Sequence, residues 1–257
     1  MKHKYNWLAV VVGNSRLHWA WFKNLAFVET WDTHHLTIAV KPNFVPPLLL
    51  HKELIRQNLS SLPVYLASVV ANQTKYWQNY FALSLITLKD IKLTNVYPTM
   101  GVDRALAVCG AIAVYQQACL VIDGGTALTF TGVDAGGKLV GGAILPGLRS
   151  QLLSLRQKTS ALPEVKLPDS LPPRWALDTD TAIASGVLHT AISGIRGYID
   201  DWLQQFPHSQ IVFTGGDGQI LWRFLVQQFP ELSEQTAVDP NLVFEGVKLI
   251  YQQKNKE

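Results

Sequence analysis

The segment VIDGGTALTFTGVDAGGKLVGGAILPGL, residues 121–148, decides the fold of this chain. An apolar strand leads into the turn Asp123-Gly124-Gly125-Thr126, and two further strand-like runs follow, near 127–132 and 138–145. Such a turn brings backbone N–H groups, a carboxylate and a hydroxyl together, and glycine lets the backbone approach a ligand closely. The combination suits a polyphosphate, whose oxygens backbone amides can bind. An ordinary hairpin turn is the alternative interpretation of these residues taken alone.

A similar pattern lies near the N-terminus. Residues 8–12 form an apolar run, Gly13-Asn14-Ser15 a turn, and residues 17–22 a second strand-like run. Later in each half, the run at 64–69 corresponds to the run at 211–217. The repetition predicts two duplicated lobes whose turns face each other around a nucleotide.

Composition limits the class of protein. The chain has 257 residues, of which 48% are hydrophobic and 16% charged, as expected for a compact globular protein with a substantial core. A net charge of +3 without a dense basic patch gives no reason to expect nucleic-acid binding. Two cysteines without metal-ligand spacing, no signal peptide and no long apolar run favour a soluble, cytoplasmic protein.

The order of the predicted elements indicates an α/β fold. In the first half we expect strands near 7–12, 17–22, 26–31, 64–69 and 84–88, with helices around 47–57, from Asn72 and from near Asp103. In the second half we expect strands near 120–124, 127–132, 138–145 and 210–214, with helices from Leu148, from about Thr179, and at about 218–229 and 240–252. Three strands followed by alternating helices and strands are typical of ribonuclease H-like lobes, which we place at 1–117 and 118–257.

The sequence Gly101-Val102-Asp103-Arg104 precedes an apolar helical run, 105–115. An aspartate before a helix is a favoured N-cap, and its charge suits the helix dipole. The same carboxylate can act as a general base, because phosphoryl transfer asks little of that base beyond its position. Arg104 can bind a substrate carboxylate or a phosphate, or it can pair with a surface acid.

Four segments, in order, resemble the type III pantothenate kinases, a branch of the superfamily of sugar kinases, heat-shock chaperones and actin. They are GNSR at 13–16, GVDR at 101–104, the block at 123–148 and FTGGDG at 213–218; the sequence TSALP at 159–163 also fits the family. The resemblance implies an actin-like ATPase fold with a nucleotide cleft between the lobes. It also implies ATP-dependent phosphorylation of pantothenate, the first step of coenzyme A biosynthesis, by a homodimer that uses Mg²⁺ and K⁺ or NH₄⁺.

The resemblance also implies roles for individual residues. Asp103 is the expected proton acceptor, Asp123 the ligand of the monovalent cation, and Thr126 a hydroxyl that contacts ATP. For pantothenate we expect a site formed by Gly101, Val102, Asp103, Arg104, Thr179 and Tyr97. For ATP we expect the first phosphate loop, Val11, Val12, Gly13, Asn14, Ser15, Arg16, Leu17 and His18, together with Gly215 and Gly216 at the adenosine end.

Two departures from the family pattern stand out. The first loop of the family usually reads Asp-x-Gly-Asn-Thr, but Val11 occupies the place of the acid, so that side chain cannot position Mg²⁺ or phosphate. Mg²⁺ can be held largely by phosphates and water. The substrate-contacting tyrosine of the family normally lies farther upstream of Gly-x-Asp-Arg than Tyr97 does.

Other interpretations of these residues remain. Thr179 can cap a helix, Gly215-Gly216 can be a simple strand-to-helix turn, His18 can be a packed or surface histidine, and Arg16 a surface charge. At the level of the whole chain, Val11 favours a nucleotide-binding regulatory protein that has lost catalysis. A kinase of the same superfamily acting on a sugar is the third hypothesis.

Overall fold

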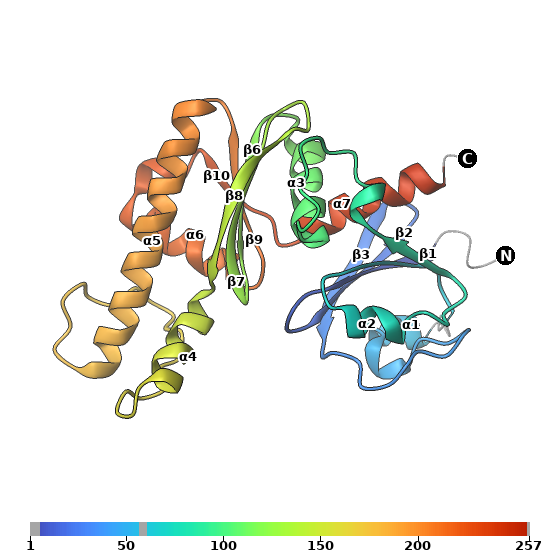
Figure 1. The fold of residues 1–257 in the computed structure, drawn as a ribbon, viewed down its shortest axis with the longest axis horizontal. Coiled ribbons are helices and arrows are strands. Elements are labelled where there is room, and N and C mark those ends of the chain that lie inside the picture. Colours follow the sequence, from blue (N-terminus) through green and yellow to red (C-terminus); the bar gives the residue numbers. More distant parts are fainter. Residues whose placement is uncertain (1–5, 57–60, 256–257) are drawn as a thin grey trace. The chain divides into compact units, whose positions relative to one another are not determined.

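A computed structural model describes residues 6–56 and 61–255. The chain forms two compact units, the first comprising residues 1–110 and 243–257 and the second residues 111–242 (Figure 1). The lobes expected from sequence, 1–117 and 118–257, differ from these units chiefly in the placement of the last helix. That helix, α7 (Leu242–Lys254), has almost all of its length in the first unit.

The first unit contains a five-stranded sheet. Its strands are β1 (Asn6–Val12), β2 (Leu17–Lys23), β3 (Ala26–Thr33), β4 (Val64–Ser68) and β5 (Leu83–Ile86), in the order β3-β2-β1-β4-β5. The pairs β1–β2 and β2–β3 are antiparallel, and the pairs β1–β4 and β4–β5 are parallel. This is the predicted ribonuclease H-like arrangement.

Helices cover the two faces of that sheet. Leu8, Val10 and Val12 of β1 belong to a buried cluster with residues of α1 (Lys52–Arg56) and from the region of α2 (Ala71–Tyr76). On the opposite face Trp7 stacks on Tyr251 of α7, with ring centroids 4.2 Å apart. Helix α3 (Val102–Tyr115) contacts α7 closely: a Cβ on Gly246 would lie 2.1 Å from the Leu106 carbonyl oxygen.

The second unit repeats the sheet. Strands β6 (Cys119–Gly124), β7 (Ala127–Val133), β8 (Leu139–Pro146), β9 (Gln210–Thr214) and β10 (Thr236–Val238) take the order β10-β9-β6-β7-β8. Again the first three strands are antiparallel neighbours and the last two join in parallel. Helices α4 (Leu148–Lys158), α5 (Thr179–Gln205) and α6 (Gly218–Gln228) complete the unit, and α5 and α6 contribute many of its core residues. The equal strand orders confirm the predicted duplication.

Some predicted elements need correction. Instead of one helix around 47–57 there is a short 3-10 turn, Pro47–Leu49, followed by α1, and residue 57 lies outside the described residues. The strand predicted near 84–88 ends at Ile86, and a second 3-10 turn, Leu88–Asp90, follows it. Strand β10 and the 3-10 turn Pro230–Leu232 were not predicted, because three residues are too few for a periodic pattern.

Within residues 6–56 and 61–255, no helix combines the length and the apolar character needed to cross a membrane. The two cysteines are buried or half-buried, and desolvation raises the pKa of each thiol, Cys109 and Cys119, to about 12. Neither thiol forms a nucleophilic thiolate near neutral pH.

Candidate functional site

The turn between β1 and β2 is the first part of the candidate site. Its backbone is closed by a hydrogen bond from the Gly13 N–H to the Arg16 carbonyl, 3.0 Å long, and the Gly13 carbonyl accepts a second from His35 Nε2 at 2.9 Å. Asn14, Ser15 and Arg16 are exposed, whereas the flanking Val12 and Leu17 are buried. The two apolar side chains anchor the turn, and its polar residues lie at the surface.

A row of side chains crosses the first sheet beside this turn. Val11 of β1 pairs with His18 of β2, and His18 pairs with Asp32 of β3, so all three side chains project from the same face. His18 Nδ1 lies 2.7 Å from Asp32 Oδ1, and the Arg16 guanidinium lies 3.5 Å from the other carboxylate oxygen. The hydrogen bond with His18 is the largest cause that lowers the pKa of Asp32. Val11 is only 3% exposed.

Asp103 lies at the start of α3. The carbonyl of Gly101 accepts the first helical hydrogen bond, from the Ala105 N–H at 3.1 Å, so Gly101 is the cap and Asp103 the second helical residue. The N-cap interpretation of Asp103 is therefore wrong. Its Oδ1 accepts a hydrogen bond from the Arg104 N–H at 2.8 Å, and a Cβ on Gly101 would come within 2.4 Å of the same oxygen.

Burial and charge act in opposite directions on the Asp103 carboxyl. Desolvation raises its pKa above the ordinary aspartate value, while the Arg104 N–H, the Arg104 charge and the His18 charge partly offset that effect. A carboxylate with a raised pKa accepts a proton more readily than an exposed one does. The environment of Asp103 therefore suits a general base.

Arg104 is buried, and its guanidinium donates a hydrogen bond to the Tyr97 hydroxyl at 2.9 Å. Tyr97 itself is 41% exposed, so it contacts the Gly101–Arg104 motif on one side and solvent on the other. The structure thus brings Tyr97 to the motif despite its unusual spacing.

The second unit has its own glycine turns at the ends of β6 and β9. Asp123 is the penultimate residue of β6, and its Oδ1 faces Gly215 so closely that a Cβ there would lie 2.2 Å away. Gly215 has a φ of +79°, a conformation that favours glycine. The Gly124 carbonyl accepts the Asp217 N–H at 2.8 Å, which fixes the two turns against each other.

Thr126 occupies the tip of the β6–β7 turn. Its carbonyl accepts hydrogen bonds from the Gly147 N–H at 2.9 Å and from Ser150 Oγ at 2.8 Å. A Cβ on Gly147 would lie 1.9 Å from the Gly125 carbonyl oxygen, so no larger residue fits there. The end of β8 therefore holds the backbone of this turn in place.

Thr179 is exposed at the first position of α5. The cap of the helix is Asp178, whose carboxylate accepts the Thr181 N–H at 2.9 Å. Thr179 is therefore not the capping residue.

The structure thus places His18 beside Gly13, Asp103 beside Gly101 and Arg104, and Asp123 beside Gly215. Sequence reasoning missed Asp32, which falls one residue beyond the predicted strand 26–31. It also missed Asp217 as a site residue: this side chain is 5% exposed and pairs with Arg149 at 3.1 Å beside the Gly215-Gly216 turn. The hairpin register would have found Asp32, but the Arg149–Asp217 pair joins distant segments and leaves no local signal.

Comparison with known proteins decides the family. Residues 7–201 match the family model described as type III pantothenate kinase. This chain belongs to the type III pantothenate kinase family. A type III pantothenate kinase from Nostoc sp. is 45% identical, over 97% of this chain and 96% of its own length. The corresponding protein of Synechocystis sp. is also 45% identical, over 95% and 90%. As a member of a kinase family, the chain is an enzyme that requires ATP and a divalent metal ion.

Solved structures show the fold. A Campylobacter jejuni protein named for the Baf family is 20% identical over 97% of this chain and all of its own, with a TM-score of 0.62. Spiroplasma citri MreB 5, solved with AMPPNP, is 12% identical over 98% of each chain, with a TM-score of 0.50. The pantothenate kinase family member described here therefore has the fold of the actin-like ATPases and sugar kinases, as the resemblance implied.

Proposed function

We propose that this chain transfers the γ-phosphoryl group of ATP to the hydroxyl of pantothenate, giving 4'-phosphopantothenate and ADP in the first step of coenzyme A biosynthesis. The observation that carries the proposal is the family match over 195 of the 257 residues, within which the Gly101–Arg104 motif and the Asp123–Thr126 turn both lie. The environment of Asp103, described above, supports the same reaction.

In this proposal Asp103 accepts the proton of the pantothenate hydroxyl while the hydroxyl oxygen bonds to the γ-phosphorus and the bond to the β-phosphate oxygen breaks. Its second position in α3 and the hydrogen bond from the Arg104 N–H hold the carboxylate in place. A loose transition state does not need a strong base, so the main requirement on Asp103 is its position.

Arg104 and Tyr97 form the proposed contact with the pantothenate carboxylate. Arginine matches a carboxylate with two parallel N–H groups, and the Tyr97 hydroxyl orients the guanidinium from one side. Gly101 and Val102 present the backbone of the same motif, and Thr179 contributes a hydroxyl.

The two glycine turns form the proposed binding surfaces for ATP. In the first unit, residues 11–18 offer backbone N–H groups and the exposed side chains of Asn14, Ser15 and Arg16. In the second unit, Thr126 offers its hydroxyl, and the Gly216 backbone lies open after the end of β9, because a Cβ there would meet no atom within 4 Å. Backbone amides at such turns favour phosphate oxygens.

We assign Mg²⁺ and a monovalent cation, K⁺ or NH₄⁺, to the reaction. Asp123 Oδ1 and the Gly124 carbonyl oxygen lie 2.2 and 2.6 Å from the position that a Cβ on Gly215 would take, so two oxygen atoms come together at this turn, which fits a hard cation with oxygen ligands. When bound, the monovalent cation would supply positive charge close to the phosphates. Buried Val11 offers no ligand, so Mg²⁺ would be held mainly by phosphate oxygens and water.

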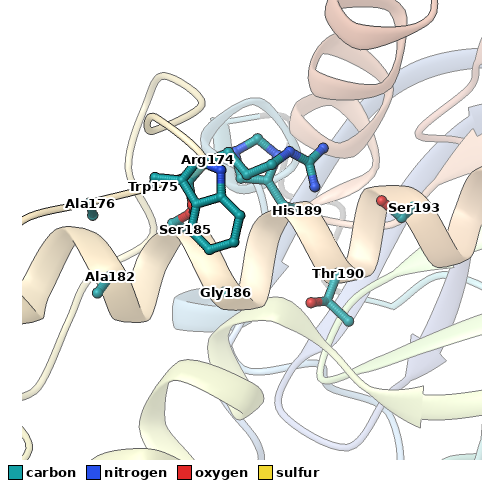
Figure 2. Close-up of a pocket in the computed structure, with 9 residues that line it drawn as sticks. All are labelled: Arg174, Trp175, Ala176, Ala182, Ser185, Gly186, His189, Thr190 and Ser193. Atoms are coloured by element: carbon teal, nitrogen blue, oxygen red, sulfur yellow. The ribbon is translucent and has the colours of Figure 1, made fainter.

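We also propose that the enzyme is a homodimer and that the face of α5 near Trp175 belongs to the interface. Figure 2 shows Arg174 and Trp175 lying over α5, beside a cavity of about 510 Å³ lined by small residues such as Gly186. Trp175 and Leu177 are 88% and 105% exposed, which is unusual for large apolar side chains on a monomer. Trp175→Ala should weaken the dimer in analytical ultracentrifugation, and an unchanged dimerisation constant would remove this surface from the interface.

The deciding experiment measures ADP release and product formation with ATP, Mg²⁺, K⁺ and pantothenate against a panel of sugars, at neutral pH as expected for a cytoplasmic enzyme. We expect phosphopantothenate with pantothenate alone. ATP binding without any product would support the regulatory protein, and stimulation by a sugar but not by pantothenate would support the sugar kinase.

A further inference from the structure

His35 lies in the segment after β3, outside the motifs of the first unit, yet its ring contacts the β1–β2 turn directly. Its Nε2 lies 2.9 Å from the Gly13 carbonyl oxygen. Because a carbonyl oxygen can only accept a hydrogen bond, Nε2 carries a proton whether or not the other ring nitrogen does. The contact therefore does not depend on the charge of the ring.

This hydrogen bond acts on the first residue of the turn. The Gly13 N–H donates to the Arg16 carbonyl at 3.0 Å, so both polar groups of the Gly13 backbone have partners within the protein. Glycine loses more conformational freedom on ordering than any other residue, so holding it in advance lowers the cost of ordering the turn around a ligand. His35 therefore restricts the backbone from which the exposed residues Asn14 and Ser15 project.

The segment that carries His35 is itself attached to α2. Gln73 of this helix binds both polar backbone groups of Leu36: its Oε1 accepts the Leu36 N–H at 2.8 Å, and its Nε2 donates to the Leu36 carbonyl at 3.0 Å. Farther along, the Val40 N–H donates to the Tyr76 carbonyl at 2.8 Å. Gln73 is 6% exposed, and Leu36 and Val40 belong to the buried cluster of the first sheet. The backbone next to His35 is therefore fixed to the helix at two places.

We propose that Gln73 and His35 hold the β1–β2 turn in the conformation that binds ATP. Gln73 fixes the backbone beside His35, and the His35 ring holds the Gly13 carbonyl, so the turn is ordered before the nucleotide arrives. The inference rests on the proposed function, in which this turn binds the phosphates of ATP. Both side chains are positioning residues, because they act through the backbone of Gly13.

The first test measures the Kd of the non-hydrolysable analogue AMPPNP with Mg²⁺ by calorimetry. His35→Phe keeps a ring but has no N–H donor, so its Kd should rise about three- to tenfold. His35→Gln keeps an amide N–H near the place of Nε2 and should restore most of the affinity. The matched control is His34→Phe at the exposed neighbouring residue, whose Kd should stay within about twofold of the wild-type value.

Steady-state kinetics separate this role from a general disturbance of the fold. In His35→Phe the KM for ATP should rise by a factor similar to that of the Kd, while kcat and the KM for pantothenate stay near their wild-type values. The Gly13 carbonyl is half-buried, so water can replace the lost donor and the variant should fold.

Gln73→Met tests the second link. Methionine fills a similar volume but cannot bind the Leu36 backbone, so the Kd should rise by less than in His35→Phe and the free energy of unfolding should fall. If Gln73 acts on the turn through His35, adding Gln73→Met to His35→Phe should not raise the Kd further, although the double variant is less stable. A further rise would remove Gln73 from the inference. The His35 variants keep their force if Gln73→Met does not fold.

Three results would overturn the role of His35. They are an unchanged Kd in His35→Phe, an equal rise in His35→Phe and His35→Gln, and a rise in the KM for pantothenate as large as that for ATP. The second would assign the effect to packing instead of the N–H donor.

Hydrogen exchange without nucleotide gives a measurement independent of activity. The amides of residues 13–17 should exchange faster in His35→Phe than in the wild type and His34→Phe, because the turn opens more often. Equal exchange in all three proteins would also contradict the inference. If the wild type binds AMPPNP but does not phosphorylate pantothenate, while the His35 differences are found, only the proposed function is lost.

Discussion

Val11 and Asp123 occupy the same place in the two sheets. Each is the penultimate residue of the central strand of its sheet, β1 or β6. Each has an antiparallel partner on one side and a parallel partner on the other. In the first unit the position is apolar and buried, whereas in the second it carries a carboxylate beside Gly215. The same backbone framework therefore supports different chemistry in its two copies.

The rows of side chains that cross the sheets explain how each unit places its acid. In the first, the acid of the row is Asp32, two strands away from Val11, with His18 between them. In the second, Asp123 lies on the central strand itself, and the row continues to Thr129 and Ile144. The first unit also carries an acid outside its sheet, Asp103 on α3. Duplication fixes the positions but not the side chains that fill them.

Loss of the Asp103 carboxylate on α3 should have the largest effect on activity. Asp103→Asn keeps the shape of the side chain but cannot accept the substrate proton, so we expect kcat to fall by about 10²–10⁴-fold. The Kd for ATP, measured by calorimetry, should stay within about twofold, and Asp201→Asn, at an exposed position, serves as the control. Turnover near the wild-type value would remove Asp103 from the role of base.

Loss of the Asp123 carboxylate on β6 should have the second largest effect. Asp123→Ala removes the side-chain ligand that we assign to K⁺ or NH₄⁺, so most activity and its dependence on these ions should disappear together. Initial rates in K⁺, NH₄⁺ and Na⁺ measure this, with Asp201→Ala as the control. A wild type fully active in Na⁺ alone would contradict the cation site.

Gly215→Ala tests whether the place beside Asp123 must lack a side chain. The added Cβ would lie 2.2 Å from Asp123 Oδ1, at a residue with φ of +79°, so the free energy of unfolding should fall by about 2 kcal/mol. Gly216→Ala is the matched control, because a Cβ there meets no atom within 4 Å. Equal losses in chemical denaturation would show that the close approach is unimportant.

Val11→Asp makes the first unit resemble the second. A carboxylate at this buried position loses hydration and competes with Asp32 for His18. The free energy of unfolding should therefore fall by about 2 kcal/mol, and by less in Val11→Ala. If the new acid also engages Mg²⁺, the half-saturating Mg²⁺ concentration should fall. An unchanged Mg²⁺ requirement would mean that an acid at this position has no part in metal binding in this chain.

The smallest expected effect is on the pH dependence of Tm. Burial raises the pKa of Asp103 above its unfolded value, so the protonated form favours folding at low pH, and that contribution is lost as pH rises through the folded pKa. Asp103→Asn removes the cost of the buried charge and should therefore raise Tm at pH 7. The difference should shrink below about pH 4, near the pKa of an unfolded aspartate. A Tm gain of equal size at every pH would point to packing instead.

Sequence reasoning predicted the parts of this comparison that depend on local pattern. The three-strand openings of both halves, the long helix from Thr179 and the turn at Asp123–Thr126 all follow from short-range periodicity and glycine. Strand β10 was missed because its parallel pairing with β9 supplies the order that its own three residues lack. The His18–Asp32 contact was missed because it depends on the hairpin register between residues 14 positions apart.

Helix α7 has a consequence for the order of events during synthesis. The second unit is one continuous stretch, 111–242, so its residues are synthesised before those of α7 that belong to the first unit. The first unit starts earlier but lacks Tyr251, which stacks on Trp7, until α7 is made. The half that is made first is therefore the half that matures last, and nascent chains paused before residue 243 would expose the apolar face of β1 to chaperones.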